Sequence, residues 1–162
     1  MWCAQSLKTT KKQKMLFSGS EGSMGYSLPA AIGAYYATKK KVICFCGDGG
    51  FQMNIQELQF LDREHLPIDI VLFNNQSLGM IRHFQEIYFK ENYFHTINKK
   101  GYSAPIFKKV VEAYNIKYKR LTFKNVNRIK MFDSTSTLYE IIMNNKTYVK
   151  RCGKIEDIIR IK

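Results

Sequence analysis

Two oxygen-bearing side chains, Asp48 and Asn75, are the residues of this chain best suited to chemistry by type and position. Asp48 lies in a glycine-flanked turn after the apolar run 42–46, and Asn75 follows a second apolar run, 68–73. Magnesium binds oxygen ligands and usually completes its octahedral shell with phosphate oxygens and water. The pattern therefore predicts a site for a divalent cation that holds a diphosphate.

A third ligand and a phosphate cradle are available beside these two side chains. The backbone carbonyl of Ser77 lies just beyond Asn75, so the predicted metal ligands are Asp48, Asn75 and Ser77. The glycines around Asp48, which let the backbone approach a phosphate closely, are Gly47, Gly49 and Gly50. A helix after this turn would point its positive N-terminal end at the same place.

The elements needed to position such a site follow in order along the chain. Residues 42–46 and 68–73 are predicted as buried parallel strands, joined by a helix at 54–63. A right-handed strand–helix–strand unit places both turns at the carboxyl edge of an open α/β sheet, where ligands bind. The other predictions are helices at 28–37, 78–88, 104–114 (with Ser103 as N-cap) and 134–144, an edge strand at 116–121 and a short strand at 147–149.

Length and composition predict one globular domain over residues 1–162. The 45% apolar content can fill a core, and no apolar run is long enough for a membrane span. Four scattered cysteines and the lack of a signal peptide favour a cytoplasmic chain with structural thiols. The net charge of +13 comes with no nucleic-acid-binding motif, so we expect a solvated basic face or an acidic partner rather than nucleic acid.

Several motifs together resemble the diphosphate-binding domain of thiamine-diphosphate-dependent enzymes, most closely the large, catalytic subunit of acetolactate synthase. The resemblance covers about residues 1–120, while 121–162 diverge. Its first residue, Met1, is similar to an internal methionine of the family, which implies an N-terminally truncated sheet. The segments that carry the resemblance are Met1-Trp2-Cys3-Ala4-Gln5, Gly22-Ser23-Met24-Gly25-Tyr26-Ser27-Leu28-Pro29-Ala30-Ala31-Ile32-Gly33-Ala34, Gly47-Asp48-Gly49-Gly50-Phe51-Gln52-Met53-Asn54, Asn74-Asn75 and Leu78-Gly79-Met80-Ile81.

The resemblance implies thiamine diphosphate and Mg²⁺ as cofactors. Gly49 and Gly50 would line the diphosphate, and Gly22 and Met24 would contact the aminopyrimidine through backbone groups. The Met24 side chain would also hold the cofactor in its bent form. The whole predicted cofactor-binding set is Gly22, Ser23, Met24, Gly47, Asp48, Gly49, Gly50, Asn75, Ser77, Leu78, Gly79 and Met80.

The implied reaction is decarboxylation of a 2-keto acid followed by carboligation, as in a transferase of branched-chain amino acid biosynthesis. The family's activating glutamate lies on a separate pyrimidine-binding domain, and neither Glu21 nor Glu57 matches it. No catalytic residue is therefore predicted on this chain. We expect it to act in a homo- or hetero-oligomer that supplies that domain.

Two alternative interpretations remain open at this point. The chain could be a non-catalytic remnant or an interaction module of the family, or it could belong to a related 2-keto acid decarboxylase or sugar-pathway carboligase. Phe84 stands where acetolactate synthases typically have tryptophan, which leaves the acceptor keto acid open. His83 is interpreted as a packing residue. A fragment, an internal start, a split gene and a decaying gene would each account for the shortened beginning.

Overall fold

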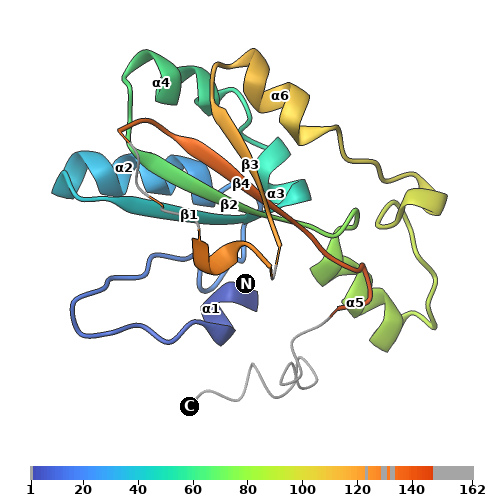
Figure 1. Cartoon of the computed structure of the whole chain (residues 1–162). Helices are drawn as coiled ribbons and strands as arrows, with labels where there is room; N and C mark the ends of the chain where they lie inside the picture. The colour runs from blue at the N-terminus through green and yellow to red at the C-terminus, as the bar shows by residue number, and fades with distance from the viewer. Residues whose placement is uncertain (1, 123, 129–130, 132–133, 148–162) are drawn as a thin grey trace.

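Four parallel strands form the sheet of this protein. The computed structural model describes residues 2–122, 124–128, 131 and 134–147. The strands lie in the order β1-β2-β4-β3, and every neighbouring pair is parallel. Their bounds are β1 Val42–Gly47, β2 Ile68–Asn74, β3 Lys117–Leu121 and β4 Thr137–Ile142. Helices flank this open sheet (Figure 1), as the sequence predicts.

The predicted strand–helix–strand unit is present, with two short helices in place of one. β1 and β2 pair in parallel from Val42↔Ile68 to Gly47↔Phe73. Helix α3 (Asp48–Gln52) begins at Asp48, where we expected a turn, and α4 (Glu57–Arg63) begins three residues later than predicted. The turn between them contacts residues 19–25 (the glycine loop), because the Asn54 side-chain amide donates to the carbonyl of Gly25 at 2.8 Å.

The prediction of a helix at 134–144 is wrong, because this segment contains strand β4. β4 lies inside the sheet and pairs with β2 on one side and β3 on the other. Its residues from Thr137 to Glu140 are all buried. Pairing with two neighbours decided the structure of this segment, since strand formation depends more on context than on local propensity. Thr147, the start of the predicted last strand, is not in a strand, and 148–149 lie outside the described residues.

Helices α2 (Ser27–Thr38) and α5 (Gly79–Tyr88) lie within about a residue of their predicted bounds. Helix α1 (Trp2–Ser6) was not predicted. Helix α6 (Phe107–Ala113) starts later than expected, after an N-cap at Ile106, so Ser103 does not cap it. Pro105 explains the delay, since the residue before a proline is disfavoured in helical geometry. Short 3₁₀ turns occupy Asn98–Lys100 and Val126–Arg128.

The main core lies between one face of the sheet and helices α2, α4 and α6. Its fully buried members include Leu58 and Leu61 of α4, Ile70 of β2 and Val111 of α6. A smaller cluster on the opposite face contains Val71, Leu121 and Tyr139. These two layers fix the strands, and therefore the loops that follow them.

The cysteines of β1 belong to the main core, as expected for structural thiols. Cys44 and Cys46 are buried and free of disulfides. A hydrogen bond that the Cys46 thiol donates to the neighbouring Cys44 side chain, together with burial, raises the pKa of Cys46 well above its ordinary value. A thiol of this kind stays protonated and is a poor nucleophile.

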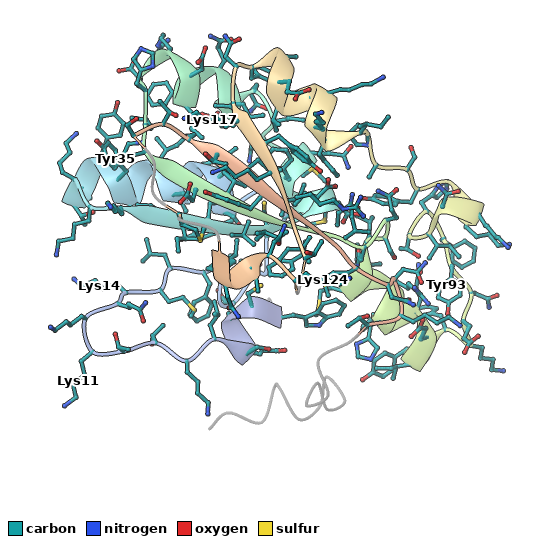
Figure 2. The ribbon with its side chains drawn as sticks, in the orientation of Figure 1. Lys11, Lys14, Tyr35, Tyr93, Lys117 and Lys124 are labelled. Carbon is teal, nitrogen blue, oxygen red and sulfur yellow. The ribbon has the colours of Figure 1, made fainter. Side chains whose placement is uncertain are left out.

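The labelled basic side chains lie on separate parts of the molecule. Lys11 and Lys14 lie on the loop before α2, Lys117 begins β3, and Lys124 follows the end of that strand (Figure 2). Among the residues that the structure describes, no helix has both the length and the apolar character needed to cross a bilayer.

Candidate functional site

The three predicted metal ligands meet at the carboxyl edge of the sheet. Asp48 follows β1 and is only 2% exposed. Its Oδ1 accepts a hydrogen bond from the Gly49 amide at 2.9 Å, and its Oδ2 accepts one from the Ser77 amide at 3.2 Å. The same Ser77 amide donates to Asn75 Oδ1 at 3.1 Å. One backbone N–H therefore joins the carboxylate oxygen and the amide oxygen that the sequence predicts as ligands.

The electrostatics of this cluster suit a cation. Burial raises the pKa of Asp48, and hydrogen bonds from the Gly49 and Ser77 amides oppose that shift. None of the ion pairs found among the described residues includes Asp48. Burying a carboxylate without a counter-charge is costly, and a bound divalent cation would supply that charge.

The described residues contain no group of three or more His, Cys, Asp or Glu side chains placed to hold a metal. A cation here would combine the Asp48 carboxylate and neutral oxygens of the site with oxygens of a bound ligand and water. This is the usual situation for Mg²⁺, which commonly combines one or two protein carboxylates with substrate phosphates and water. The donor set of one carboxylate and one amide oxygen therefore fits a magnesium–diphosphate group.

Gly49 forms a cradle next to the carboxylate. A methyl group placed on Gly49 would collide with Leu78 Cδ2, and it would lie 3.1 Å from Met24 Cε and 3.5 Å from the Tyr102 hydroxyl. Side chains from three separate segments therefore pack around the Cα of Gly49, which carries only hydrogen atoms. A larger residue here would displace Leu78 or Met24, two residues that the sequence predicts to contact the cofactor.

A second glycine, Gly79, allows the start of α5 to approach residues 75–78, the loop that carries the predicted ligands Asn75 and Ser77 (the ligand loop). A methyl group on Gly79 would lie 2.7 Å from Asn75 Nδ2 and 3.0 Å from the ring of Trp2. A methyl group on Gly50, the residue after Gly49, would lie 3.7 Å from the backbone nitrogen of Gly25. The glycines of the predicted site thus lie where segments distant in sequence meet.

The glycine loop contributes Met24 to this cluster. Gly22 and Gly25 adopt positive φ angles of 60° and 85°, which favour glycine. Ser23 and Met24 line one end of a groove of about 560 Å³ that continues along α2. Gly22 and Ser23 precede Met24 in the loop, Gly47 precedes Asp48, and Met80 lies in the first turn of α5. The cofactor-binding roles of these residues stay predictions.

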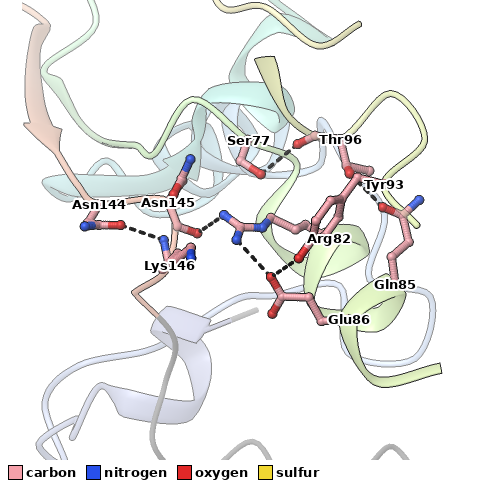
Figure 3. Close-up of polar contacts among 9 residues, drawn as sticks. All are labelled: Ser77, Arg82, Gln85, Glu86, Tyr93, Thr96, Asn144, Asn145 and Lys146. Atoms are coloured by element: carbon pink, nitrogen blue, oxygen red, sulfur yellow. Dashed lines mark hydrogen bonds and ion pairs between the residues drawn. The ribbon is translucent and has the colours of Figure 1, made fainter. Parts of the chain in front are cut away.

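A hydrogen-bonded chain connects the ligand loop to α5 (Figure 3). Ser77 Oγ donates to the carbonyl of Thr96 at 2.7 Å, and Thr96 Oγ1 donates to Gln85 Oε1 at 2.7 Å. Ser77 and Thr96 are almost completely buried. The position of Ser77 relative to α5 is thus fixed by groups that water does not reach.

We expect Thr96→Val to lower the free energy of unfolding by about 1–3 kcal/mol, because it leaves the buried Gln85 oxygen without its donor. Urea unfolding would measure this change. Thr38→Val is the matched control: its hydroxyl donates to Ala34 at an exposed helix end, so a change within about 0.5 kcal/mol is expected. Equal costs for the two variants would contradict the structural role of the Thr96 link.

Arg82 anchors the same buried face of α5 as Gln85. Its Nη1 donates to the carbonyl of Asn145 at 2.6 Å, and its Nη2 pairs with Glu86 at 2.9 Å. Tyr93 also donates to Glu86, at 2.9 Å (Figure 3). The segment after β4 and the loop after α5 are therefore both held to this helix.

Helix α5 has its polar face inside and part of its apolar face outside. Arg82 and Gln85 are buried, whereas Ile81, Phe84 and Ile87 are each about 40% exposed. The Phe84 ring lies 4.7 Å from that of Tyr88, centroid to centroid. A helix of a soluble domain normally turns its apolar face inward, so an exposed aromatic face of this kind indicates a binding surface.

The sequence analysis missed Tyr102 as a site residue. Its hydroxyl lies beside Asp48 and Gly49, but it comes from a loop outside the motifs after β1 and β2. No spacing rule connects a lone tyrosine before a helix with an aspartate more than fifty positions earlier. Only tertiary structure could place it here.

Comparison with known proteins identifies the family. Residues 1–149 match the model of "Thiamine pyrophosphate enzyme, C-terminal TPP binding domain". The chain is 47% identical over 118 residues to the acetolactate synthase large subunit of Porphyra purpurea, covering 72% of this chain and 20% of that protein. It is 40% identical over 126 residues to the acetolactate synthase isozyme 2 large subunit of Escherichia coli (strain K12), covering 77% of this chain and 22% of that protein.

A solved structure extends the similarity to the fold. The thiamine diphosphate-dependent 4-hydroxybenzoylformate decarboxylase of Rhodococcus jostii RHA1 matches with a TM-score of 0.65 and 26% identity, over 76% of this chain and 24% of that one. The chain belongs to the family of C-terminal thiamine-diphosphate-binding domains and is similar in sequence to acetolactate synthase large subunits. This confirms the predicted family and its cofactor, thiamine diphosphate. The chain spans about a fifth of the length of the curated relatives it matches.

Proposed function

We propose that this chain supplies the Mg²⁺–diphosphate half of the active site of an acetolactate-synthase-like enzyme, acting as one domain over residues 1–162. The observation that carries the proposal is the buried Asp48 carboxylate, which has no ion-pair partner within the part of the chain that the structure describes and is joined to Asn75 through the Ser77 amide. The whole enzyme would decarboxylate a 2-keto acid and join the product to a second keto acid. We place it in the cytoplasm, in branched-chain amino acid biosynthesis.

The residues of the site have separate tasks in this proposal. Asp48, Asn75 and the Ser77 carbonyl hold the cation, and Gly49 with its neighbour Gly50 lets the diphosphate approach the backbone. Met24 and Leu78 cover the cradle and exclude water from it. Bound thiamine diphosphate supplies the carbon nucleophile that attacks the keto acid. The chain itself binds and orients the cation and the cofactor.

The activating acid–base group must come from a pyrimidine-binding domain, in a homo- or hetero-oligomer. Support for such a partner comes from α5, whose exposed apolar side chains lie on the element that follows the ligand loop. We propose that Ile81, Phe84 and Ile87 contact that domain. Burying such a surface would stabilise the complex and exclude water from the site.

We expect pyruvate consumption only when the chain is mixed with the pyrimidine-binding domain of a related acetolactate synthase large subunit, Mg²⁺ and thiamine diphosphate. The Phe84→Ser/Ile87→Ser variant should keep its fold and lose both association and turnover, measured by gel filtration and a pyruvate assay. Phe94→Ser is the matched control, because Phe94 is exposed but lies outside α5. A stable, cofactor-loaded complex that consumes no pyruvate would favour a non-catalytic remnant.

The product distinguishes a second candidate function. The solved relative is a decarboxylase, and Phe84 replaces the tryptophan expected for the acceptor keto acid. If the assembled enzyme only decarboxylates, the product is an aldehyde. If it ligates, the product is a 2-hydroxy-3-keto acid. Product analysis by mass spectrometry in the same assay separates the two.

A further inference from the structure

The hydroxyl group of Tyr102 is buried next to the Asp48 carboxylate, yet it makes no hydrogen bond of good geometry with any of the described residues. Buried hydroxyl groups in native proteins are nearly always paired, since an unmade hydrogen bond costs free energy. The exception here lies in the predicted site, where a methyl group on Gly49 would lie 3.5 Å from the hydroxyl. A hydroxyl that is unpaired without a ligand, in a cradle that requires glycine, suggests a partner that is not part of the chain.

The backbone holds Tyr102 in a fixed relation to the ligand loop. Its amide donates to the carbonyl of Ile97 at 3.1 Å, and Ile97 forms a bridge with Ser77. Ser77 in turn donates to Asp48. The phenol and the carboxylate are therefore parts of one connected structure.

The chemistry of the phenol decides what kind of atom it can bind. A tyrosine hydroxyl is protonated at neutral pH and offers one O–H donor. An anionic oxygen is the best acceptor for such a donor.

We propose that Tyr102 is a further binding residue of this site, whose hydroxyl donates a hydrogen bond to an oxygen of the bound diphosphate. The inference rests on the proposed function and adds a hydrogen-bond donor to the site beside Gly49. The cation would neutralise the diphosphate, and Tyr102 would orient it. The hydroxyl would then have the well-placed partner that the described residues do not supply.

Isothermal titration of the 162-residue chain with thiamine diphosphate, and separately with inorganic diphosphate, both in Mg²⁺, tests this inference. Tyr102→Phe should weaken binding of both ligands about 10- to 100-fold, the loss expected for a hydrogen bond to a charged group. The melting temperature of the ligand-free variant should be unchanged or higher, because an unpaired buried hydroxyl has been removed. A purely structural role would lower the melting temperature and leave the affinities unchanged, which would overturn the inference.

Tyr93→Phe is the matched control. Its hydroxyl already has a partner, Glu86 at 2.9 Å, so this variant should lose stability and keep both affinities. If the wild-type chain binds both ligands and Tyr102→Phe binds them equally well, only the Tyr102 inference fails. If the wild-type chain shows no Mg²⁺-dependent binding, the proposed function fails with it.

Discussion

Asp48→Ala should abolish Mg²⁺-dependent binding of thiamine diphosphate by this chain. Asp48 is the carboxylate at the centre of the site, and it is buried without an ion-pair partner among the described residues. Residues that merely support metal ligands cost 10- to 100-fold in affinity when replaced, so losing the charged ligand should cost more than about 100-fold. Isothermal titration with and without Mg²⁺ measures the effect.

Two further variants separate lost binding from lost folding. Asp48→Asn keeps the shape of the side chain and one oxygen that can accept from the Gly49 or the Ser77 amide, but it removes the charge, so it should fold and still bind poorly. Asp62→Ala removes a carboxylate from α4 that accepts from the Asn115 side chain, and it should leave cofactor affinity unchanged. Metal-independent binding by the wild-type chain, or full binding by Asp48→Asn, would rule out the proposed metal site.

Gly49→Ala should weaken thiamine diphosphate binding by about 100-fold with little loss of stability. The new methyl group would enter the space shared by Leu78 Cδ2 and Met24 Cε, both ends of flexible side chains that can move. Gly49 lies within α3 and has no positive φ angle, so the backbone tolerates alanine. The new methyl group fills the cradle, however. Displacing the bound diphosphate by about 1 Å can cost a factor of about 100.

Gly33→Ala provides the comparison for Gly49→Ala. Gly33 lies within α2, and a methyl group placed there would meet nothing within 4 Å. Alanine should therefore stabilise the helix by about 0.5–1 kcal/mol and leave cofactor affinity unchanged. Thermal unfolding measures the stability of the two variants, and titration measures their affinity for the cofactor. Gly33→Ala should change the stability alone, and Gly49→Ala mainly the affinity. Unchanged affinity for Gly49→Ala would show that the diphosphate does not approach this glycine.

Local sequence determined the part of the site that lies directly after β1 and β2. Apolar runs at 42–46 and 68–73 specify buried parallel strands, and strands of one parallel sheet end at a common edge. The positions of Asp48 and Asn75 follow from this rule without further information. The bounds of α2 and α5 were predictable for a similar reason, since apolar spacing and Pro29 are local signals.

Tertiary structure decided the features that depend on distant partners. Residues 137–142 form a strand because β2 and β3 lie on either side, although their sequence was compatible with a helix. The polar face of α5 points inward because Thr96 and Asn145 reach Gln85 and Arg82 there.

Tyr102 joins the site through the bridge between Ser77 and Ile97, a contact that no local pattern encodes. The sequence alone therefore determined which oxygens end the strands and, through its motifs, which cofactor they suit. The packed structure decided what surrounds those oxygens, because contacts between distant segments form only when the whole chain is folded.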